Sequence, residues 1–241
     1  MKTTDYIENK IERFPKGYVF TYKDFITEVN TKEAIIKSLN RMVASGKIAK
    51  LSKGKFYKPE NTVFGKLQPE QYQVVKDLLE KNGKTIGYLT GYSIFNQFGL
   101  STQVSNIIQI GRNDTRPALK RGKYKISFVK QKNIISKENI PLLQLLDCIR
   151  FIKKIPDTSI ESSVKRMRAL INERSAPEQD KMVRLALKYR PSAKALLGAI
   201  LEDLGESKKT EPLKKSLNPI TIYRINIPGN VLRTAKNWNI I

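Results

Sequence analysis

The sequence contains no histidine and one cysteine, Cys148. Without histidine the chain has no imidazole general base and no Ser-His or Cys-His dyad. One cysteine cannot form an internal disulfide, and it cannot complete a Cys/His zinc site. No apolar run approaches the roughly 18 residues of a membrane helix, and the polar N-terminus is unlike a secretory signal. We therefore expect a cytoplasmic protein without a membrane partner, a bound metal or a cofactor.

Acidic residues are also scarce. The chain carries 22 Asp and Glu against 45 Lys and Arg over 241 residues, a formal net charge of +23. Such a protein attracts polyanions before any specific contact forms. The alternative is charge that serves only solubility in a lysine-rich proteome, but that bias normally raises glutamate as well. The composition favours a nucleic-acid partner.

The first 58 residues have the pattern of a small compact domain. Apolar spacing predicts a helix over about 4–13, ended by Pro15 and Gly17, and a second helix over about 22–29 that buries Phe25, Ile26 and Val29. A third helix is expected from Asn30, as N-cap, to Ser45, with Gly46 as its left-handed cap. The period then changes to two over residues 47–51 and 55–58, around a turn at 52–54.

Three short helices followed by a basic hairpin predict a winged helix-turn-helix. Residues 31–58 hold eight Lys and Arg against one acid, Glu33, which argues against the alternative of a small α+β protein-binding domain. The third helix would lie in the major groove with Lys37 and Arg41 toward base edges, and the hairpin lysines would reach phosphates. The predicted DNA contacts of this domain are Lys32, Lys37, Ser38, Arg41, Lys53 and Lys55.

The rest of the chain predicts a linker and a larger domain. Residues 59–69 have linker composition, and a helix is expected over 70–81. A short helix bracketed by glycines over 87–100, strands over 106–110 and 123–129, and helices over about 141–154, 159–173, 177–189 and 192–204 follow. A charged stretch at 205–215 leads to an extended run at 220–225. The fold class is thus α+β and helix-rich: a winged helix-turn-helix over 1–58, a linker over 59–69 and a mainly helical domain over 70–241.

A second basic run lies at residues 112–132, with eight Lys and Arg against one Asp. It is either a second DNA contact or a surface for an acidic partner, and nonspecific phosphate contact is slightly favoured. The candidate contacts in this run are Arg112, Arg116, Lys120 and Arg121.

Two patterns could carry chemistry, but a structural interpretation is preferred for both. Cys148 lies in an apolar helix without a neighbouring base, which predicts a buried core thiol. Pro156-Asp157 and Glu206-Ser207-Lys208 superficially resemble the motif of restriction-type nucleases. That fold places the second half on a core strand, whereas here it falls in a charged segment after a helix. We therefore expect no enzyme activity.

Three segments together resemble the AbiEi-type antitoxins of type IV toxin–antitoxin systems. They are Arg41–Ile48 at the end of the predicted winged helix, Tyr88–Val104 with its Leu-Thr-Gly and Gly-Leu-Ser-Thr-Gln sequences, and Leu145–Asp157. The resemblance covers about residues 1–160. It implies a winged helix that binds inverted repeats in its own promoter. It also implies a second domain that counteracts a nucleotidyltransferase toxin without a stable complex.

Three hypotheses remain open. The first is a DNA-binding autorepressor and antitoxin, acting as a monomer or homodimer on double-stranded DNA. The second is a plain winged-helix regulator whose C-terminal domain binds a ligand or a partner. The third is a nuclease tethered to a winged helix, which would depend on Asp157 and Glu206.

Overall fold

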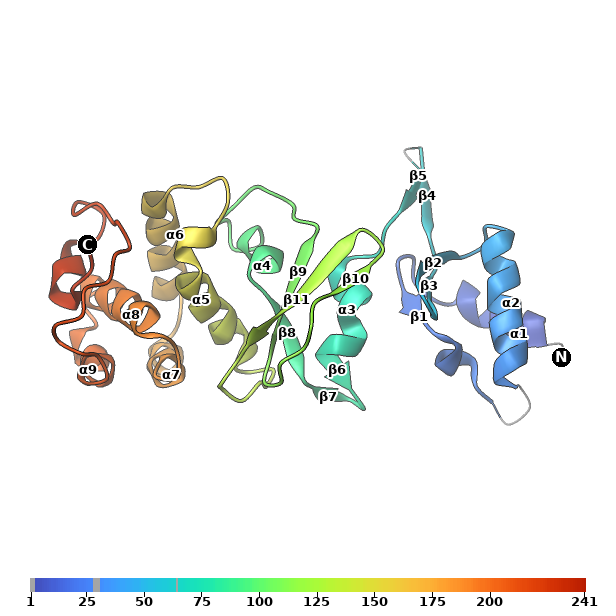
Figure 1. The fold of residues 1–241 in the computed structure, drawn as a ribbon, viewed down its shortest axis with the longest axis horizontal. Coiled ribbons are helices and arrows are strands. Elements are labelled where there is room, and N and C mark those ends of the chain that lie inside the picture. The colour runs from blue at the N-terminus through green and yellow to red at the C-terminus, as the bar shows by residue number, and fades with distance from the viewer. Residues whose placement is uncertain (1–2, 28–30, 64) are drawn as a thin grey trace. The chain divides into compact units, whose positions relative to one another are not determined.

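The computed structural model describes residues 3–27, 31–63 and 65–241, and the protein is α+β. The chain forms two compact units, Met1–Asp77 with Lys120–Tyr124, and Leu78–Leu119 with Lys125–Ile241. Figure 1 shows the helices and strands of each unit. In the described part of the chain, no helix has both the length and the apolar character needed to cross a membrane.

The N-terminal unit combines short helices with a small antiparallel sheet. Helix α1 (Thr3–Glu12), strand β1 (Val19–Phe20), the 3-10 turn η1 (Tyr22–Phe25) and helix α2 (Lys32–Ala44) come first. The hairpin of β2 (Ala49–Ser52) and β3 (Lys55–Tyr57) follows, and β1 pairs with β3 so that the strand order is β1-β3-β2 (Figure 1).

One apolar cluster holds these elements together. Ile7 of α1, Phe20 of β1, Phe25 of η1, and Ile35 and Leu39 of α2 are each at most 1% exposed. Burial of side chains of this size stabilises a fold by about 1.5–3 kcal/mol each. The position of α2 is therefore fixed by its apolar stripe.

The segment predicted as a second helix differs from expectation. Thr21 and Asp24 form a capping box, but the turn they start ends at Phe25, because Ile26 is extended (φ −64°, ψ 129°). Ile26 is 55% exposed, so the prediction that it is buried is wrong. The predicted burial of Val29 and the predicted N-cap Asn30 lie outside the described residues. Helix α2 instead begins after Thr31, whose side chain accepts a hydrogen bond from the Ala34 amide at 3.3 Å.

The segment for which a linker was predicted contains a second hairpin, β4 (Glu60–Thr62) with β5 (Gly65–Leu67). Helix α3 (Gln71–Leu79) follows, and its residues up to Asp77 belong to the N-terminal unit. Lys120–Tyr124, the tip of a later hairpin, also belongs to this unit.

A four-stranded sheet has the strand order β10-β11-β9-β8, and its residues belong to the second unit apart from those in Lys120–Tyr124. The bounds are β8 Gly87–Thr90, β9 Ile107–Arg112, β10 Leu119–Arg121 and β11 Tyr124–Lys130. Strand β9 pairs antiparallel with β8 and parallel with β11. A two-stranded ribbon, β6 (Glu80–Lys81) with β7 (Lys84–Thr85), precedes β8, and a short helix α4 (Tyr92–Phe95) follows it.

The remaining helices of this unit share one apolar core that extends to the C-terminal tail. At its centre α8 buries every residue from Ala193 to Leu201, and Trp238 packs against Gly198. Their bounds are α5 Ile140–Arg150, η2 Ile152–Lys154, α6 Ile160–Asn172, α7 Ala176–Ala186, α8 Pro191–Asp203, α9 Ser207–Lys215 and η3 Arg233–Trp238.

Two segments of the second unit differ from the sequence-based prediction. Residues 87–90, predicted as helix, form strand β8, because both Tyr88 and Leu89 pair with β9 rather than with their own chain neighbours. The charged stretch 205–215 is helix α9, which buries only Thr210 and Leu213. The predicted extended run at 220–225 contains a single bridge from Tyr223 to Ile240.

Candidate nucleic-acid interface

Helix α2 of the N-terminal unit presents a cationic face opposite its buried stripe. Lys37, Asn40, Arg41 and Ala44 are all exposed, whereas Ile35, Leu39 and Met42 are at most 4% exposed. Spacings of three, four and seven residues place the four exposed residues on one side of the helix. In the described part of the chain neither Lys37 nor Arg41 forms an ion pair. We call Lys37, Asn40, Arg41 and Ala44 the α2 face.

Lys32 lies at the start of the same helix and is exposed. Its ammonium nitrogen is 5.4 Å from the centroid of the Tyr22 ring, a cation–π distance that leaves the charge in place. Lys32 therefore extends the positive surface toward the N-terminus of α2.

Ser38 does not belong to this surface. It is 1% exposed, and its hydroxyl lies 3.5 Å from that of Thr4 in α1. The choice of Ser38 as a DNA contact required an exposed side chain and is therefore wrong in that respect, because the contact between α1 and α2 covers the side of α2 next to Leu39. A buried hydroxyl that already has a partner is not available to DNA.

The hairpin β2–β3 has two lysines close to its turn, and they differ in their surroundings. Lys53 is exposed beside Gly54, whose φ of +72° forms the turn. Lys55 is 18% exposed in its side chain, and its ammonium nitrogen is 3.0 Å from Oδ2 of Asp77. Lys53 remains a candidate phosphate contact, whereas the charge of Lys55 is already paired.

Arg121, from the second basic run, pairs with the same carboxylate. Its side chain is 9% exposed, and it donates to Oδ1 of Asp77 at 2.5 Å and to the carbonyl oxygen of Val74 at 2.8 Å. Burial opposes ionisation of Asp77, but the hydrogen bonds and charges of Arg121 and Lys55 outweigh it, so the pKa of this carboxyl is held below its ordinary value. Arg121 thus fastens the hairpin tip to α3.

The other candidates in the second basic run also divide into buried and exposed. Arg112 is 5% exposed and donates to the Leu78 carbonyl oxygen at 2.6 Å and to Asp114 at 2.5 Å. Arg116 is half-exposed and donates to the same carboxylate at 2.8 Å. Lys120, at the hairpin tip of the N-terminal unit, is exposed. Lys120 alone of the four is both exposed and outside an ion pair among the described residues.

Two members of the α2 face, Asn40 and Ala44, were missed at the sequence level. The signal was present, since both follow Lys37 at helical spacing on the side away from Leu39. Asn40 matters most, because an asparagine amide can donate to and accept from one adenine edge.

Two segments that carry the family resemblance meet in a buried polar cluster of the second unit. Tyr88 and Thr90 each donate a hydroxyl hydrogen bond to Oδ2 of Asp147 at 2.7 Å, and Tyr189 donates to its Oδ1 at 3.1 Å. Asp147 is 0% exposed, and burial raises the pKa of its carboxyl although these hydrogen bonds oppose the rise. Because every partner is internal, this cluster joins β8 to α5 rather than forming an open reactive site.

Cys148 is next to this cluster in sequence and is 0% exposed, which confirms the predicted core thiol. Burial and the charge of Asp147 raise the pKa of the thiol well above its ordinary value. The thiolate, which is the nucleophilic form, is therefore disfavoured.

The nuclease-like pattern gains no support from the positions of its acids. Asp157 is an exposed turn residue with φ of +53°, and Glu206 is the N-cap of α9 and pairs with Lys209 at 2.9 Å. Within residues 3–27, 31–63 and 65–241, no group of three or more Cys, Asp or Glu side chains is placed to hold a metal ion.

Fold and site together define an α+β protein with a cationic helix face on a small N-terminal unit. The chain belongs to DUF6088, a family of unknown function whose model matches residues 6–179. No curated protein sequence matches the chain. The crystal structure of the RV2827C protein from Mycobacterium tuberculosis is similar, with a TM-score of 0.60 and 12% sequence identity over 94% of this chain and 86% of that one. At this identity the likeness shows the fold alone.

Proposed function

We propose that the N-terminal unit is a winged helix-turn-helix and that the protein is a DNA-binding transcriptional repressor of its own promoter. The order of α1, η1, α2 and the hairpin β2–β3 supports this proposal, in which α2 would be the recognition helix and the hairpin would be the wing. The observation that carries the proposal is the α2 face, which presents two cations and an amide without an acidic partner among the described residues.

The chemistry of the α2 face suits the major groove. An arginine guanidinium can donate two hydrogen bonds to guanine, and an asparagine amide can bind adenine in the same bidentate way. Arg41 and Asn40 are adjacent on the helix surface and offer these two groups. Lys37, Lys32 and Lys53 supply the charge that holds the helix and the wing against phosphates.

The antitoxin role is a further part of the proposal, and it is supported by the resemblance to AbiEi-type proteins. The segments that carry this resemblance in the second unit, Tyr88–Val104 and Leu145–Asp157, are joined through Asp147. Growth of cells that express a nucleotidyltransferase encoded beside this gene, with and without this protein, tests the role. Unchanged toxicity would remove the antitoxin role and leave the repressor proposal standing.

Binding to promoter DNA tests the main proposal. Fluorescence anisotropy would compare the protein's own promoter fragment with a scrambled fragment across a salt series. We expect a preference of about 10³-fold or more for the promoter, as specific DNA-binding proteins show. The Lys37→Ala/Arg41→Ala variant should lose this preference, because it removes two charges from the α2 face and, with Arg41, a group that can bind a guanine edge.

An Arg184→Ala/Lys208→Ala variant is the matched control. It removes two exposed cations from helices α7 and α9 of the second unit, and it should retain the preference. If both fragments bind wild-type protein equally, with affinity that falls steeply in salt, binding is electrostatic only and the repressor proposal is wrong.

A further inference from the structure

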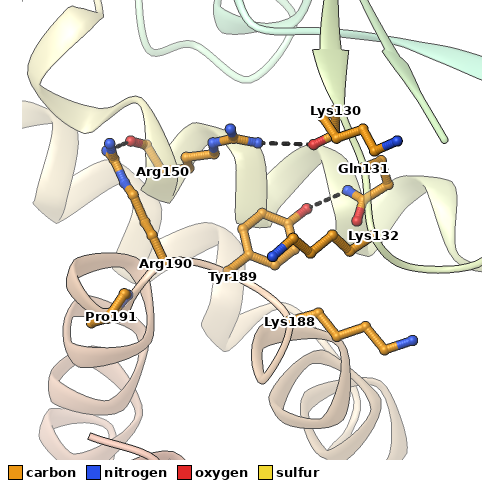
Figure 2. A pocket seen from close by; sticks show the side chains of 8 residues that line it. All are labelled: Lys130, Gln131, Lys132, Arg150, Lys188, Tyr189, Arg190 and Pro191. Atoms are coloured by element: carbon orange, nitrogen blue, oxygen red, sulfur yellow. Dashed lines mark hydrogen bonds between the residues drawn. The ribbon is translucent and has the colours of Figure 1, made fainter. Parts of the chain in front are cut away.

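A cavity of about 320 Å³ opens in the second unit, and no residue of the α2 face lines it. It lies at the end of β11, the C-terminal end of α5 and the turn between α7 and α8, as Figure 2 shows. Eight residues line it: Lys130, Gln131, Lys132, Arg150, Lys188, Tyr189, Arg190 and Pro191. Its volume is within the range of small-molecule sites.

The lining has an uncompensated positive charge. It includes five cations, and among the residues that the structure describes no Asp or Glu lines the cavity. None of the five forms an ion pair with any other described residue. Asp147, which is hydrogen-bonded to Tyr88, Thr90 and Tyr189 beneath the surface, interacts with the charge of Arg150 and offsets part of it. Most of the positive charge of the five cations is left for a ligand or for solvent.

The two arginines are held by backbone carbonyls, which leaves their charge intact. Arg150 donates to the carbonyl oxygen of Lys130 at 3.3 Å, and Arg190 donates to the carbonyl oxygen of Arg150 (Figure 2). Burial and the charge of Arg150 both lower the pKa of Arg190, so the two guanidinium groups oppose each other's charge. A bound anion would relieve this repulsion.

The neutral part of the cavity wall is rigid. Gln131 and Tyr189 are 3% and 8% exposed, and the Gln131 amide donates to the Tyr189 hydroxyl at 2.8 Å. That hydroxyl donates in turn to buried Asp147. Helix α8 begins at Pro191 with its N-terminus at the cavity, which adds the partial positive charge of a helix start. The two arginines are therefore held against a hydrogen-bonded wall, so little ordering of these two side chains is needed on binding.

We propose that this cavity binds a compact phosphate anion, such as pyrophosphate or the polyphosphate of a nucleotide. Guanidinium groups recognise phosphate oxygens bidentately, and flexible lysines add charge around them. A hollow concentrates several cations on one multiply charged group, whereas duplex DNA presents its phosphates on a convex rod. The ligand site would give the second unit a sensing role that does not depend on whether the α2 face binds DNA.

Isothermal titration calorimetry of the full chain tests the site. Inorganic pyrophosphate, adenosine triphosphate, adenosine and inorganic sulfate would be titrated separately at low salt. We expect pyrophosphate and the triphosphate to bind and adenosine not to bind. Affinity for pyrophosphate should fall at least about ten-fold, or 1.4 kcal/mol, in an Arg150→Gln/Arg190→Gln variant. Tighter binding of the triphosphate than of pyrophosphate would identify a nucleotide as the source of the phosphate, and equal binding would identify the polyphosphate alone.

A second variant, Lys132→Gln/Lys188→Gln, controls for misfolding, because both lysines are exposed and neither side chain forms a hydrogen bond or an ion pair with another described residue. It should also weaken pyrophosphate binding, while Arg184→Gln/Lys208→Gln should not. The proposal is overturned if wild-type protein binds neither phosphate, if sulfate binds as tightly as pyrophosphate, or if the cavity variants and the control bind alike.

Discussion

The two basic runs of the chain, residues 31–58 and 112–132, each contain eight Lys and Arg against one acid. In the first run Lys37, Arg41 and Lys53 stay exposed and outside ion pairs among the described residues. In the second run Arg112 and Arg121 are buried and donate to backbone carbonyls of α3. The same number of charges therefore leaves these cations free on the surface in one segment, whereas in the other it includes two arginines that are used for internal contacts.

The difference follows from what surrounds each cation. A helix such as α2 buries one stripe and leaves the opposite side in water, so its cations remain free. A cation within a sheet hairpin can be covered by a neighbouring element, and burial then requires a partner for its charge. Arg121 has such partners in Asp77 and the Val74 carbonyl. Local charge counts cannot distinguish these outcomes.

The largest effect should come from removing the fastening arginine. Replacing Arg121 by Met keeps an apolar stem but leaves the Val74 carbonyl oxygen without its donor and leaves Asp77 paired with Lys55 alone. The free energy of unfolding in urea should fall by about 2 kcal/mol, because a charged hydrogen bond to the Val74 carbonyl oxygen and part of a half-exposed ion pair are lost. Lys37→Met, on the α2 face, should change it by less than about 0.5 kcal/mol. Equal losses of unfolding free energy in the two variants would show that the two basic runs do not differ in their contribution to stability.

A smaller effect is expected from the amide of the α2 face. Asn40→Ala should weaken binding to the preferred promoter by about 1.5 kcal/mol, roughly ten-fold, because one base contact is lost. Ser38→Ala is the matched control on the buried side of the same helix and should leave DNA affinity unchanged. Anisotropy titrations would measure both variants. A stronger effect from Ser38→Ala than from Asn40→Ala would contradict the orientation of α2.

Much of the fold could be predicted where local signals decide the structure. The apolar stripe of α2 and the Gly46 cap, with φ of +76°, are encoded within one segment. Strand β1 could not be predicted, because its two residues become a strand only by pairing with β3. Helix α9 was missed because it buries only Thr210 and Leu213, so its sequence has no apolar stripe that would indicate a helix.

The same distinction between local signals and long-range packing applies to the candidate site. Helical periodicity placed Lys37 and Arg41 on an exposed face, and the same periodicity applied further would have included Asn40. Periodicity could not show that Asp77 pairs with Arg121, which is 44 residues away, or that it also pairs with Lys55. Such pairs depend on long-range packing, which local patterns do not contain. The cavity cations around Arg150 and Arg190 were missed for this reason too.

The shared carboxylate of Asp77 also makes the stability of the folded protein depend on pH. The pKa of Asp77 is lowered in the folded protein, so its stabilisation is present above the unfolded pKa of about 3.9 and is lost as pH falls through the folded value. Asp77 is half-exposed, so screening limits the effect to about 1 kcal/mol. Asp77→Asn should therefore be less stable than wild type at neutral pH, and the two should converge in urea unfolding at acid pH. A constant difference across this range would show that Asp77 does not act through its charge.

The smallest effect separates the two lysines of the hairpin. If Lys53 contacts a phosphate, Lys53→Ala should reduce the slope of log affinity against log salt by about 0.9, because one fewer counterion is released on binding. Lys55 is already paired with Asp77 at 3.0 Å, so Lys55→Ala should change the slope by much less. Salt series on one promoter fragment measure both slopes. Equal changes would mean that Lys55 leaves Asp77 to contact DNA. The contrast between exposed and paired cations would then not hold for the hairpin β2–β3.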